Sequence, residues 1–278
     1  MENYDRKTVD GFGDEWTRYD QSQLTATEHS ELFDRYFGIF PWDELPADSV
    51  GFDLGCGSGR WAQLVANKVG ILHCIDASPS ALAVARRNLG EHHNCHFHLA
   101  SVDGLPIEDR TMDFGYSLGV LHHVPDTQSG INSCVAKLKP GAPFLLYLYY
   151  AFDNRPIWFK VIWRVSDVVR RLVSRMPFGL RSAASQLLAA LVYWPLARGA
   201  LLLEKCGLQN VGRLPLADYR KLSFYSMRTD ALDRFGTRLE QRFTSEEIAR
   251  MMRQAGLEKI RFSETVPYWT AVGFKAEN

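Results

Sequence analysis

The chain has 278 residues, of which 46% are hydrophobic, and this suits one large domain with a substantial core. Its 32 basic and 32 acidic residues cancel, which argues against a nucleic-acid-binding protein, and no such module is visible. The five cysteines include no Cys-x-x-Cys pair, so we expect reduced thiols. The first residues lack the pattern of a secretion signal, and we therefore expect a cytoplasmic protein.

The neutral total hides an uneven distribution of charge along the chain. Residues 1–150 hold 20 acids against 11 Lys or Arg, whereas residues 151–213 hold ten Lys or Arg against three acids. The change in charge coincides with a change in hydrophobic pattern. We therefore expect a single domain, 1–278, with an N-terminal cap over 1–46 and a helical insertion over 151–230.

After the cap, short apolar runs alternate with amphipathic segments. Strands are predicted near 49–54, 71–75, 95–100, 112–118 and 143–150, and helices near 59–68, 79–88 and 128–137. This alternation predicts a parallel sheet covered by helices on both faces. Ligands of such sheets bind at the carboxyl ends of the strands, which is where the acidic residues of the next motifs lie.

The first strand ends in Asp53 and continues into a loop with Gly55, Gly57 and Gly59. A dinucleotide-binding fingerprint would need a further glycine at residue 60, which is arginine. An acid followed by Gly-x-Gly-x-Gly instead resembles motif I of the class I S-adenosylmethionine (SAM) methyltransferases. The resemblance implies that Asp53 and the three glycines contact SAM.

Further motifs follow in the order that this family has. The second strand ends in Asp76, about twenty residues past the glycine loop, where an acid is placed to accept both ribose hydroxyls; Ala77 adjoins it. The stretch Ser101-Val102-Asp103 resembles the third motif, in which the acid or its neighbour binds the adenine amino group.

The fourth strand and its exit complete the resemblance. Ser117 and Leu118 lead into Val-Leu-His-His-Val, a form similar to small-molecule methyltransferases, and Leu-Lys-Pro-Gly-Ala over 138–142 resembles the turn before strand five. The cap element Gly-Phe-Gly-Asp-Glu-Trp over 11–16 resembles a segment that folds over SAM, so Phe12 and Trp16 are expected to contact the cofactor. Aromatic faces stabilise a sulfonium by up to ~2 kcal/mol when water is excluded.

The candidate catalytic residues lie after strands four and five. Methyl transfer needs a base only when the acceptor must lose a proton, and otherwise depends on positioning. The candidates for base or hydrogen-bonding roles are His122, His123, Tyr149, Tyr150 and Asn154. The histidines and cysteine of 92–98 alternate between faces of a strand, so we expect no metal site there.

The insertion begins with an amphipathic helix after Pro156. Its apolar stripe is Trp158, Val161, Ile162, Val165 and Val169, and its basic residues, with Asp167 and Ser174, take the other side. A second helix is predicted over 182–205, interrupted as a membrane span by Pro195 and Arg198. We expect a lid whose stripe is buried in the closed protein. A basic amphipathic helix on an anionic membrane is the alternative.

The chain closes as this fold usually does. Thr244 precedes a helix to Gly256, and 259–263 and 268–274 are predicted as antiparallel strands. The expected fold is α/β: a Rossmann-like, seven-stranded, mostly parallel sheet with helices on both faces, an antiparallel last strand and a helical lid insertion after strand five.

The predicted function is SAM-dependent methylation of a small, partly apolar acceptor in a lidded aromatic pocket, in small-molecule biosynthesis. The Asn/Asp-Pro-Pro-Tyr signature of amide methylation is absent from the fourth motif. One alternative is a cyclase of this fold that converts SAM to azetidine-2-carboxylate and methylthioadenosine. A second alternative is a SAM-binding peripheral membrane protein, and the oligomeric state stays open.

Overall fold

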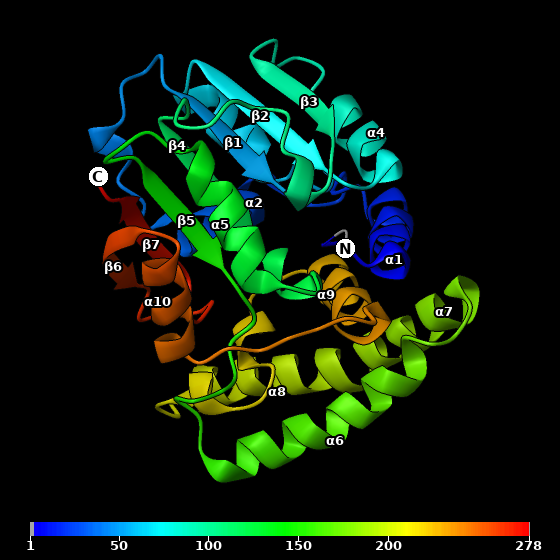
Figure 1. The fold of residues 1–278 in the computed structure, drawn as a ribbon. Coiled ribbons are helices and arrows are strands. Elements are labelled where there is room, and N and C mark those ends of the chain that lie inside the picture. The colour runs from blue at the N-terminus through cyan, green and yellow to red at the C-terminus, as the bar shows by residue number, and fades with distance from the viewer. Residues whose placement is uncertain (1–2, 278) are drawn as a thin grey trace. The chain divides into compact units, whose positions relative to one another are not determined.

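The computed structural model describes residues 3–277, which form two compact units (Figure 1). The first, here the sheet unit, consists of the residues up to Asp20, of Glu31–Asp153 and of the residues from Leu239 onward. The second, here the helical unit, consists of Gln21–Ser30 and Asn154–Arg238. Each unit has its own hydrophobic core.

The sheet unit is built on seven strands in the order β3-β2-β1-β4-β5-β7-β6. Their bounds are β1 Val50–Leu54, β2 Ile71–Asp76, β3 Cys95–Leu99, β4 Phe114–Leu118, β5 Pro143–Tyr147, β6 Leu257–Phe262 and β7 Ala271–Lys275. Strand β7 runs antiparallel to both of its neighbours, and the remaining pairs are parallel. This confirms the predicted Rossmann-like class, including the reversed last strand. The carboxyl ends of β1, β2 and β4 lie side by side.

Helices cover both faces of this sheet (Figure 1). They are α1 Arg6–Arg18, α2 Ala26–Phe37, α3 Ala62–Val65, α4 Pro79–Asn88, α5 Thr127–Lys137 and α10 Ser245–Gln254. On one face, residues of α5 and α10 pack with the inward side chains of β1 and β5. On the other, the C-terminal part of α2 packs with α3, α4 and residues of β4. Helix α1 packs against α4.

Several boundaries differ from the predicted ones for local reasons. The sequence predicts strand five over 143–150, but β5 ends at Tyr147, after which Tyr149 and Ala151 exchange backbone hydrogen bonds with Phe243. The helix predicted over 59–68 is only α3 with a 3₁₀ turn. Strand β7 begins at Ala271 because the preceding residues form a turn closed by Thr270.

The helical unit consists of long helices after β5. They are α6 Ile157–Val173, α7 Phe178–Leu188, α8 Trp194–Lys205 and α9 Phe224–Gly236. Its core joins Met227, Ala231 and Phe235 of α9 to Val173 and Tyr193. A π-helical segment connects α7 to α8 without a break. Pro195 follows this π-helical segment almost directly, and the helix continues through it.

The continuity of α7 and α8 bears on the membrane expectation. Together they form one helix, Phe178–Lys205, whose length and apolar composition would be enough to cross a bilayer. Within its most apolar 18-residue stretch, 22% is buried inside the protein. The helix predicted over 182–205 is therefore continuous through Pro195, and Pro195 and Arg198, taken from the sequence as interruptions of a membrane span, do not break it. Buried helices of soluble proteins meet the same criteria, and the criteria alone decide nothing.

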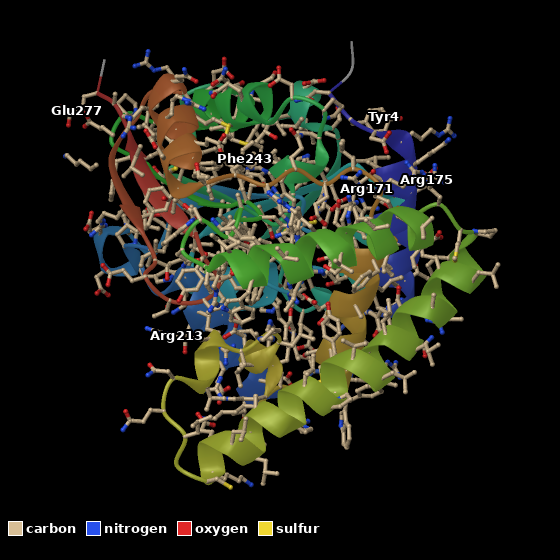
Figure 2. All side chains as sticks on the ribbon, turned by 90° about the horizontal axis from the view of Figure 1, so that it is seen from below. Tyr4, Arg171, Arg175, Arg213, Phe243 and Glu277 are labelled. Atoms are coloured by element: carbon tan, nitrogen blue, oxygen red, sulfur yellow. The ribbon has the colours of Figure 1, made fainter. Side chains whose placement is uncertain are left out.

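Helix α6 also differs from its prediction. Its apolar stripe, expected to be buried, is exposed: Val165 is 64% exposed and Trp158 48% exposed. Two members of its expected polar side, Asp167 and Arg170, are buried instead. Arg171 and Arg175, which project from the C-terminal end of α6, are exposed (Figure 2).

Candidate cofactor-binding site

The glycine loop after β1 has a backbone that other residues rarely adopt. Gly55, Gly57 and Gly59 have φ angles of +78°, +55° and +77°. A Cβ atom at Gly57 would lie 2.9 Å from the indole of Trp16, and one at Gly55 would lie 2.3 Å from the side chain of Val120. Glycine is thus required here by backbone conformation and by packing together. The loop lies close under α1 and the exit of β4.

Asp76, at the end of β2, is held by two backbone donors. The N–H of Gly57 donates to one carboxylate oxygen at 2.9 Å, and the N–H of Ser78 donates to the other at 2.8 Å. Burial raises the pKa of Asp76, while the donors from Ser78 and Gly57 oppose that rise. Each oxygen keeps a second lone pair, so the fixed carboxylate can still accept from a ligand.

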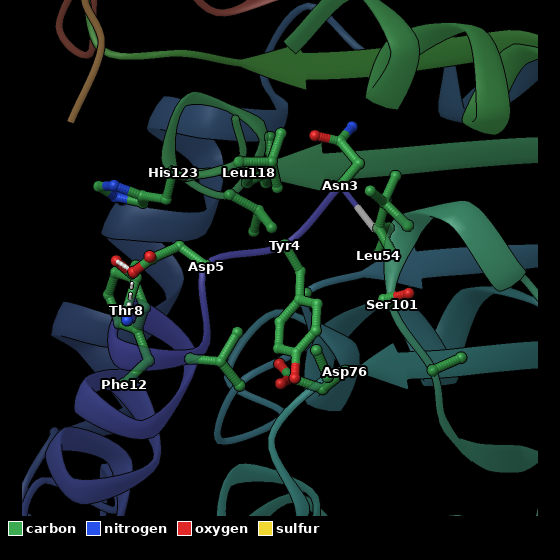
Figure 3. A pocket seen from close by; sticks show the side chains of 18 of the residues that line it. Asn3, Tyr4, Asp5, Thr8, Phe12, Leu54, Asp76, Ser101, Leu118 and His123 are labelled. Carbon is green, nitrogen blue, oxygen red and sulfur yellow. Dashed lines mark hydrogen bonds between the residues drawn. The ribbon is translucent and has the colours of Figure 1, made fainter. Parts of the chain in front are cut away.

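A pocket opens at the carboxyl ends of β1, β2 and β4 (Figure 3). It brings together half of the expected site residues, namely Phe12, Trp16, Gly55, Asp76, Ala77, Ser101, Val102, Leu118 and His123. Residues that the sequence analysis did not single out complete it, among them Tyr4, Val9, Leu54 and Val120. The lining is predominantly apolar, with Asp76 at one end and His123 at the other.

The N-terminal segment is part of this pocket. The side chain of Asn3 donates to the carbonyl of Asp126 at 2.7 Å and accepts from its N–H at 2.8 Å, and the backbone N–H of Asn3 donates to Asp103. The Tyr4 ring then points into the pocket toward Asp76 (Figure 3). No periodicity or motif marks these residues in the sequence, because the contacts join segments about a hundred residues apart.

Five expected cofactor ligands lie outside the pocket lining. Asp53 is 2% exposed, and burial raises its pKa well above the usual range. The hydroxyl of Ser117 donates to the Leu54 carbonyl within the sheet at 3.1 Å. Asp103 is exposed, and its carboxylate accepts a hydrogen bond from the backbone N–H of Asn3. Gly57 and Gly59 also stay behind the lining, where they shape the loop.

The two histidines after β4 have different surroundings. His123 lines the pocket, 5.0 Å from the Phe12 ring, and its Nδ1 lies 2.6 Å from the carbonyl of Leu239. A carbonyl can only accept, so Nδ1 carries the proton and Nε2 is the basic nitrogen. His122 is fully buried against Tyr149, with ring centroids 3.8 Å apart. Neither of its ring nitrogens has a hydrogen-bond partner among the described residues.

The segment over 239–243 positions this histidine pair. Besides the Leu239 contact, the N–H of Gln241 donates to the His122 carbonyl at 3.0 Å, and its side chain donates to the Val124 carbonyl at 2.7 Å. The Arg242 guanidinium lies 5.0 Å from the centre of the Tyr149 ring. No motif or periodicity marks this segment in the sequence, because its role lies in contacts with residues over a hundred positions away.

The other candidate residues are not part of the pocket lining. Tyr149 reaches it only through the histidines, and Tyr150 packs on Phe152 and Tyr268 with centroid distances of 4.5 and 5.6 Å. Asn154 belongs to the helical unit and is exposed. Within residues 3–277, no three His, Cys, Asp or Glu side chains converge as metal ligands would.

Comparison with known proteins assigns the central part of this unit. The sequence profile of the methyltransferase domain family matches residues 52–141. Phosphoethanolamine N-methyltransferase 2 of Caenorhabditis elegans is 33% identical over 100 residues, which are 35% of this chain and 23% of that protein. A ubiquinone biosynthesis O-methyltransferase of Coxiella burnetii is 29% identical over 104 residues, 37% of this chain and 43% of that protein. The chain thus spans less than half of either relative.

Solved structures share the fold beyond the matched segment. The CurJ carbon methyltransferase superimposes with a TM-score of 0.53 at 12% identity, over 96% of this chain and 60% of that one. A protein of Bacillus halodurans C-125 with a provisional methyltransferase name gives 0.50 at 15% identity, over 85% and 72%. At such identities the likeness concerns the fold. Over residues 52–141, the chain thus matches the methyltransferase domain family.

Proposed function

We propose that the protein binds SAM in this pocket and transfers its methyl group to a small, partly apolar acceptor. The observation that carries the proposal is the Asp76 carboxylate, fixed by the glycine loop and by the start of α4 at the pocket wall. In the SAM-dependent family, an acid at this position accepts the ribose hydroxyls. Charge-assisted hydrogen bonds of this kind contribute about 1.5–3 kcal/mol each when shielded from water.

The remaining lining supports the same orientation of the cofactor. Gly55 leaves the loop backbone open to a ligand that a Cβ atom would keep away. Ser101 and Val102 lie at the end where the family binds adenine, and Phe12 and Trp16 provide aromatic surface for a sulfonium. When bound, SAM supplies the electrophilic methyl group, and these side chains hold it and exclude water.

The composition of the pocket favours a neutral acceptor over a phosphorylated one. Among the described residues that line it there is no lysine or arginine, whereas Asp5 and Asp76 are both present. A phosphate group would find no cation there and two nearby acids. Of the acceptors that the relatives' names indicate, a ubiquinone precursor therefore fits this lining better than phosphoethanolamine.

His123 is the candidate base for an acceptor that loses a proton. Its Nδ1 faces the Leu239 carbonyl, so its Nε2 is the basic nitrogen at the pocket wall. His122, Tyr149 and Arg242 stack behind it and hold its position. A base placed in this way contributes typically ~10²–10⁴-fold to a rate, and only for hydroxyl or protonated-amine acceptors.

Calorimetry with SAM and with S-adenosylhomocysteine tests the binding proposal. The wild-type protein should bind both at one site, and Asp76→Asn should weaken both by at least about tenfold, the equivalent of one charge-assisted bond. Asp109→Asn, an exposed acid paired with Lys137, removes the same charge at the surface and should leave the affinity unchanged. Equal affinities for wild type and Asp76→Asn would remove the basis of the proposal.

Mass spectrometry of the protein incubated with SAM alone separates methyl transfer from cyclisation. A methyltransferase without acceptor should leave SAM intact apart from its slow spontaneous decay. Enzyme-dependent methylthioadenosine together with azetidine-2-carboxylate would instead establish the cyclase. The relatives matched over 52–141 are named methyltransferases, and this is why methyl transfer is the function proposed.

A further inference from the structure

Large apolar side chains are exposed almost exclusively on the helical unit. Of the 21 exposed large hydrophobic residues among those described, 20 lie between residues 157 and 224, and the other is Leu99 of the sheet unit. On α6 they recur at helical spacing, with Ile157 80%, Val161 50%, Val165 64% and Leu172 62% exposed. Such a concentration marks a binding surface, since isolated exposed hydrophobes are normal and contiguous ones are not.

The buried side of α6 is polar and is fastened to the rest of its unit. The Arg170 guanidinium donates to Asp167 at 2.7 Å and to the carbonyl of Thr237 at 3.0 Å, and all three residues are buried. Arg234 donates to Ser166 at 2.9 Å. Rotating the helix to bury its apolar stripe would expose these bonds or break them. The outward direction of the stripe is therefore built into the unit.

The continuous helix of α7 and α8 is arranged in the same way. Its inner stripe consists of small or polar residues, Ser182, Ser185, Ala189, Ala197 and Ala200, all of which are buried. Polar anchors secure that stripe, as the Tyr193 hydroxyl donates to Asp230 at 2.9 Å and Arg198 donates to the Arg220 carbonyl at 2.7 Å. Its large side chains, such as Leu187 and Leu191, are the exposed ones.

The charge that this unit exposes is predominantly positive. Residues 154–238 carry fifteen Lys or Arg and five Asp or Glu. The most exposed charged side chains in this range, all of which is described, are basic; they are Arg164, Arg171, Arg175, Lys205, Arg213, Lys221 and Arg238. Each of the five acids is buried or half-buried. Arg171 and Lys221 are ion-paired with Asp167 and Glu204, and the other exposed cations add to a surplus of positive charge. Exposed aliphatic residues beside such a surplus match the chemistry of an anionic phospholipid surface.

We propose that α6 and the helix α7–α8 bind anionic phospholipid membranes, lying in the interface with their exposed aliphatic side chains among the acyl chains. Arg164 and Arg175 then face the headgroups beside the α6 stripe, as long basic side chains do at such interfaces. Helix α7–α8 lies on the bilayer and does not cross it, because crossing would expose the anchors at Tyr193 and Arg198 to lipid. This inference is independent of SAM binding and goes beyond the proposed function.

A second copy of the chain is the competing occupant of this surface. A symmetric dimer formed through it would bring the same patch of each molecule together. The exposed cations of α6 and α8 would then face one another. The acid of these two helices that reaches the surface, Glu204, is already paired with Arg220 and Lys221. A membrane with anionic headgroups supplies the missing negative charge, and for this reason the surface favours lipid.

Sedimentation with vesicles tests the proposal on the full-length protein. It should sediment with phosphatidylcholine vesicles that contain phosphatidylglycerol, bind vesicles of phosphatidylcholine alone far more weakly, and be released as salt is raised. The triple variant Val161→Asp, Val165→Asp, Leu172→Asp places charges in the exposed stripe and should lower partitioning by at least about tenfold. Leu99→Asp, at the exposed hydrophobe of the sheet unit, is the matched control and should bind as wild type.

A charge-reversal variant keeps the test decisive should the aspartates impair folding. Arg164→Glu, Arg175→Glu, Lys205→Glu should abolish the preference for phosphatidylglycerol, whereas the same change of charge on the sheet unit, Arg250→Glu, Arg253→Glu, Lys259→Glu, should preserve it. Circular dichroism verifies the fold of each variant. The proposal is overturned if the wild-type protein does not bind the anionic vesicles. It is equally overturned if light scattering gives a dimer that the aspartate variant splits while vesicle binding is absent.

Discussion

Tyr4 and Asp76 meet inside the pocket, although 72 positions of sequence separate them. The Tyr4 ring points toward the carboxylate that we assign to the ribose, and Asn3 anchors the segment on the backbone of Asp126 (Figure 3). Bound SAM and the ring would need the same space beside Asp76. We therefore expect the N-terminal segment to shift when SAM binds as proposed.

Removing the Tyr4 ring should accordingly strengthen SAM binding. In Tyr4→Ala the cofactor no longer displaces an aromatic side chain from the pocket, so calorimetry should give a Kd several-fold below that of wild type. Tyr36→Ala, which removes an aromatic residue that packs on Trp61 and Tyr147 away from the pocket lining, is the control for general loosening. Weaker binding by Tyr4→Ala alone would mean that the ring packs onto the bound cofactor.

His122 makes the stability of the sheet unit depend on pH. Burial, with the charges of His123 and Arg242, lowers the pKa of His122 well below its ordinary value of about 6.5. The unfolded chain therefore binds a proton that the folded chain excludes, and stability is lost as the pH falls below about 6.5.

Replacing that histidine should flatten the pH profile. In His122→Phe the ring still stacks on Tyr149, and the free energy of unfolding should lose about 1 kcal/mol less per pH unit between about pH 6 and about pH 5. Urea unfolding across this range measures the slope. His93→Phe, at an exposed site, should retain the full wild-type slope. An unchanged slope in His122→Phe would show that the ring is protonated when folded.

Among the elements, the glycine loop is the least tolerant of substitution. Alanine at Gly57 would adopt a φ of +55° and bring its Cβ within 2.9 Å of the Trp16 indole, which α1 holds in place. We expect Gly57→Ala to cost about 2 kcal/mol or more of stability, from backbone strain and the displaced ring, and to weaken SAM binding.

Gly199→Ala is the matched control for that substitution. Gly199 lies inside α8, where an added Cβ would meet nothing within 4 Å. This variant should gain up to about 1 kcal/mol from helix propensity and leave SAM affinity unchanged. Thermal unfolding measures the stability of both variants, and calorimetry measures their affinity for SAM. Similar effects at the two positions would show that the loop does not require glycine at residue 57.

The elements that sequence predicts best are those with local signals. Asp76 and the glycine loop follow a strand with a motif of fixed spacing, and their contact through Gly57 agrees with it. The segment 239–243 has no such signal, since its role lies in hydrogen bonds to residues over a hundred positions away. The α6 helix was predicted by its periodicity, but periodicity does not tell which face is buried; the buried contacts of Arg170 decide that.

At the scale of the whole molecule, the two units differ in sign of charge as well as in structure. The helical stretch 154–238 has a surplus of ten positive charges, yet the chain as a whole is neutral. The acids are therefore concentrated on the sheet unit, which contains the SAM-site candidate. A protein with this partition can be drawn to an anionic surface through one unit while the other carries the chemistry.

Hydrogen exchange should show that SAM and vesicles protect two separate parts of the chain. SAM should slow exchange in the sheet unit, over 10–20 and around Gly57, Ser78 and Ser101, because those backbone groups form the pocket and its supports. Vesicles containing phosphatidylglycerol should slow exchange over 157–205 and leave the pocket unaffected. The Asp76→Asn variant should lose the protection by SAM and keep the protection by vesicles. The aspartate variant of α6 should lose the protection by vesicles and keep the protection by SAM. If SAM without vesicles slows exchange over 157–205, the helices act as a lid on the cofactor, and the regions protected by SAM and by vesicles are not separate.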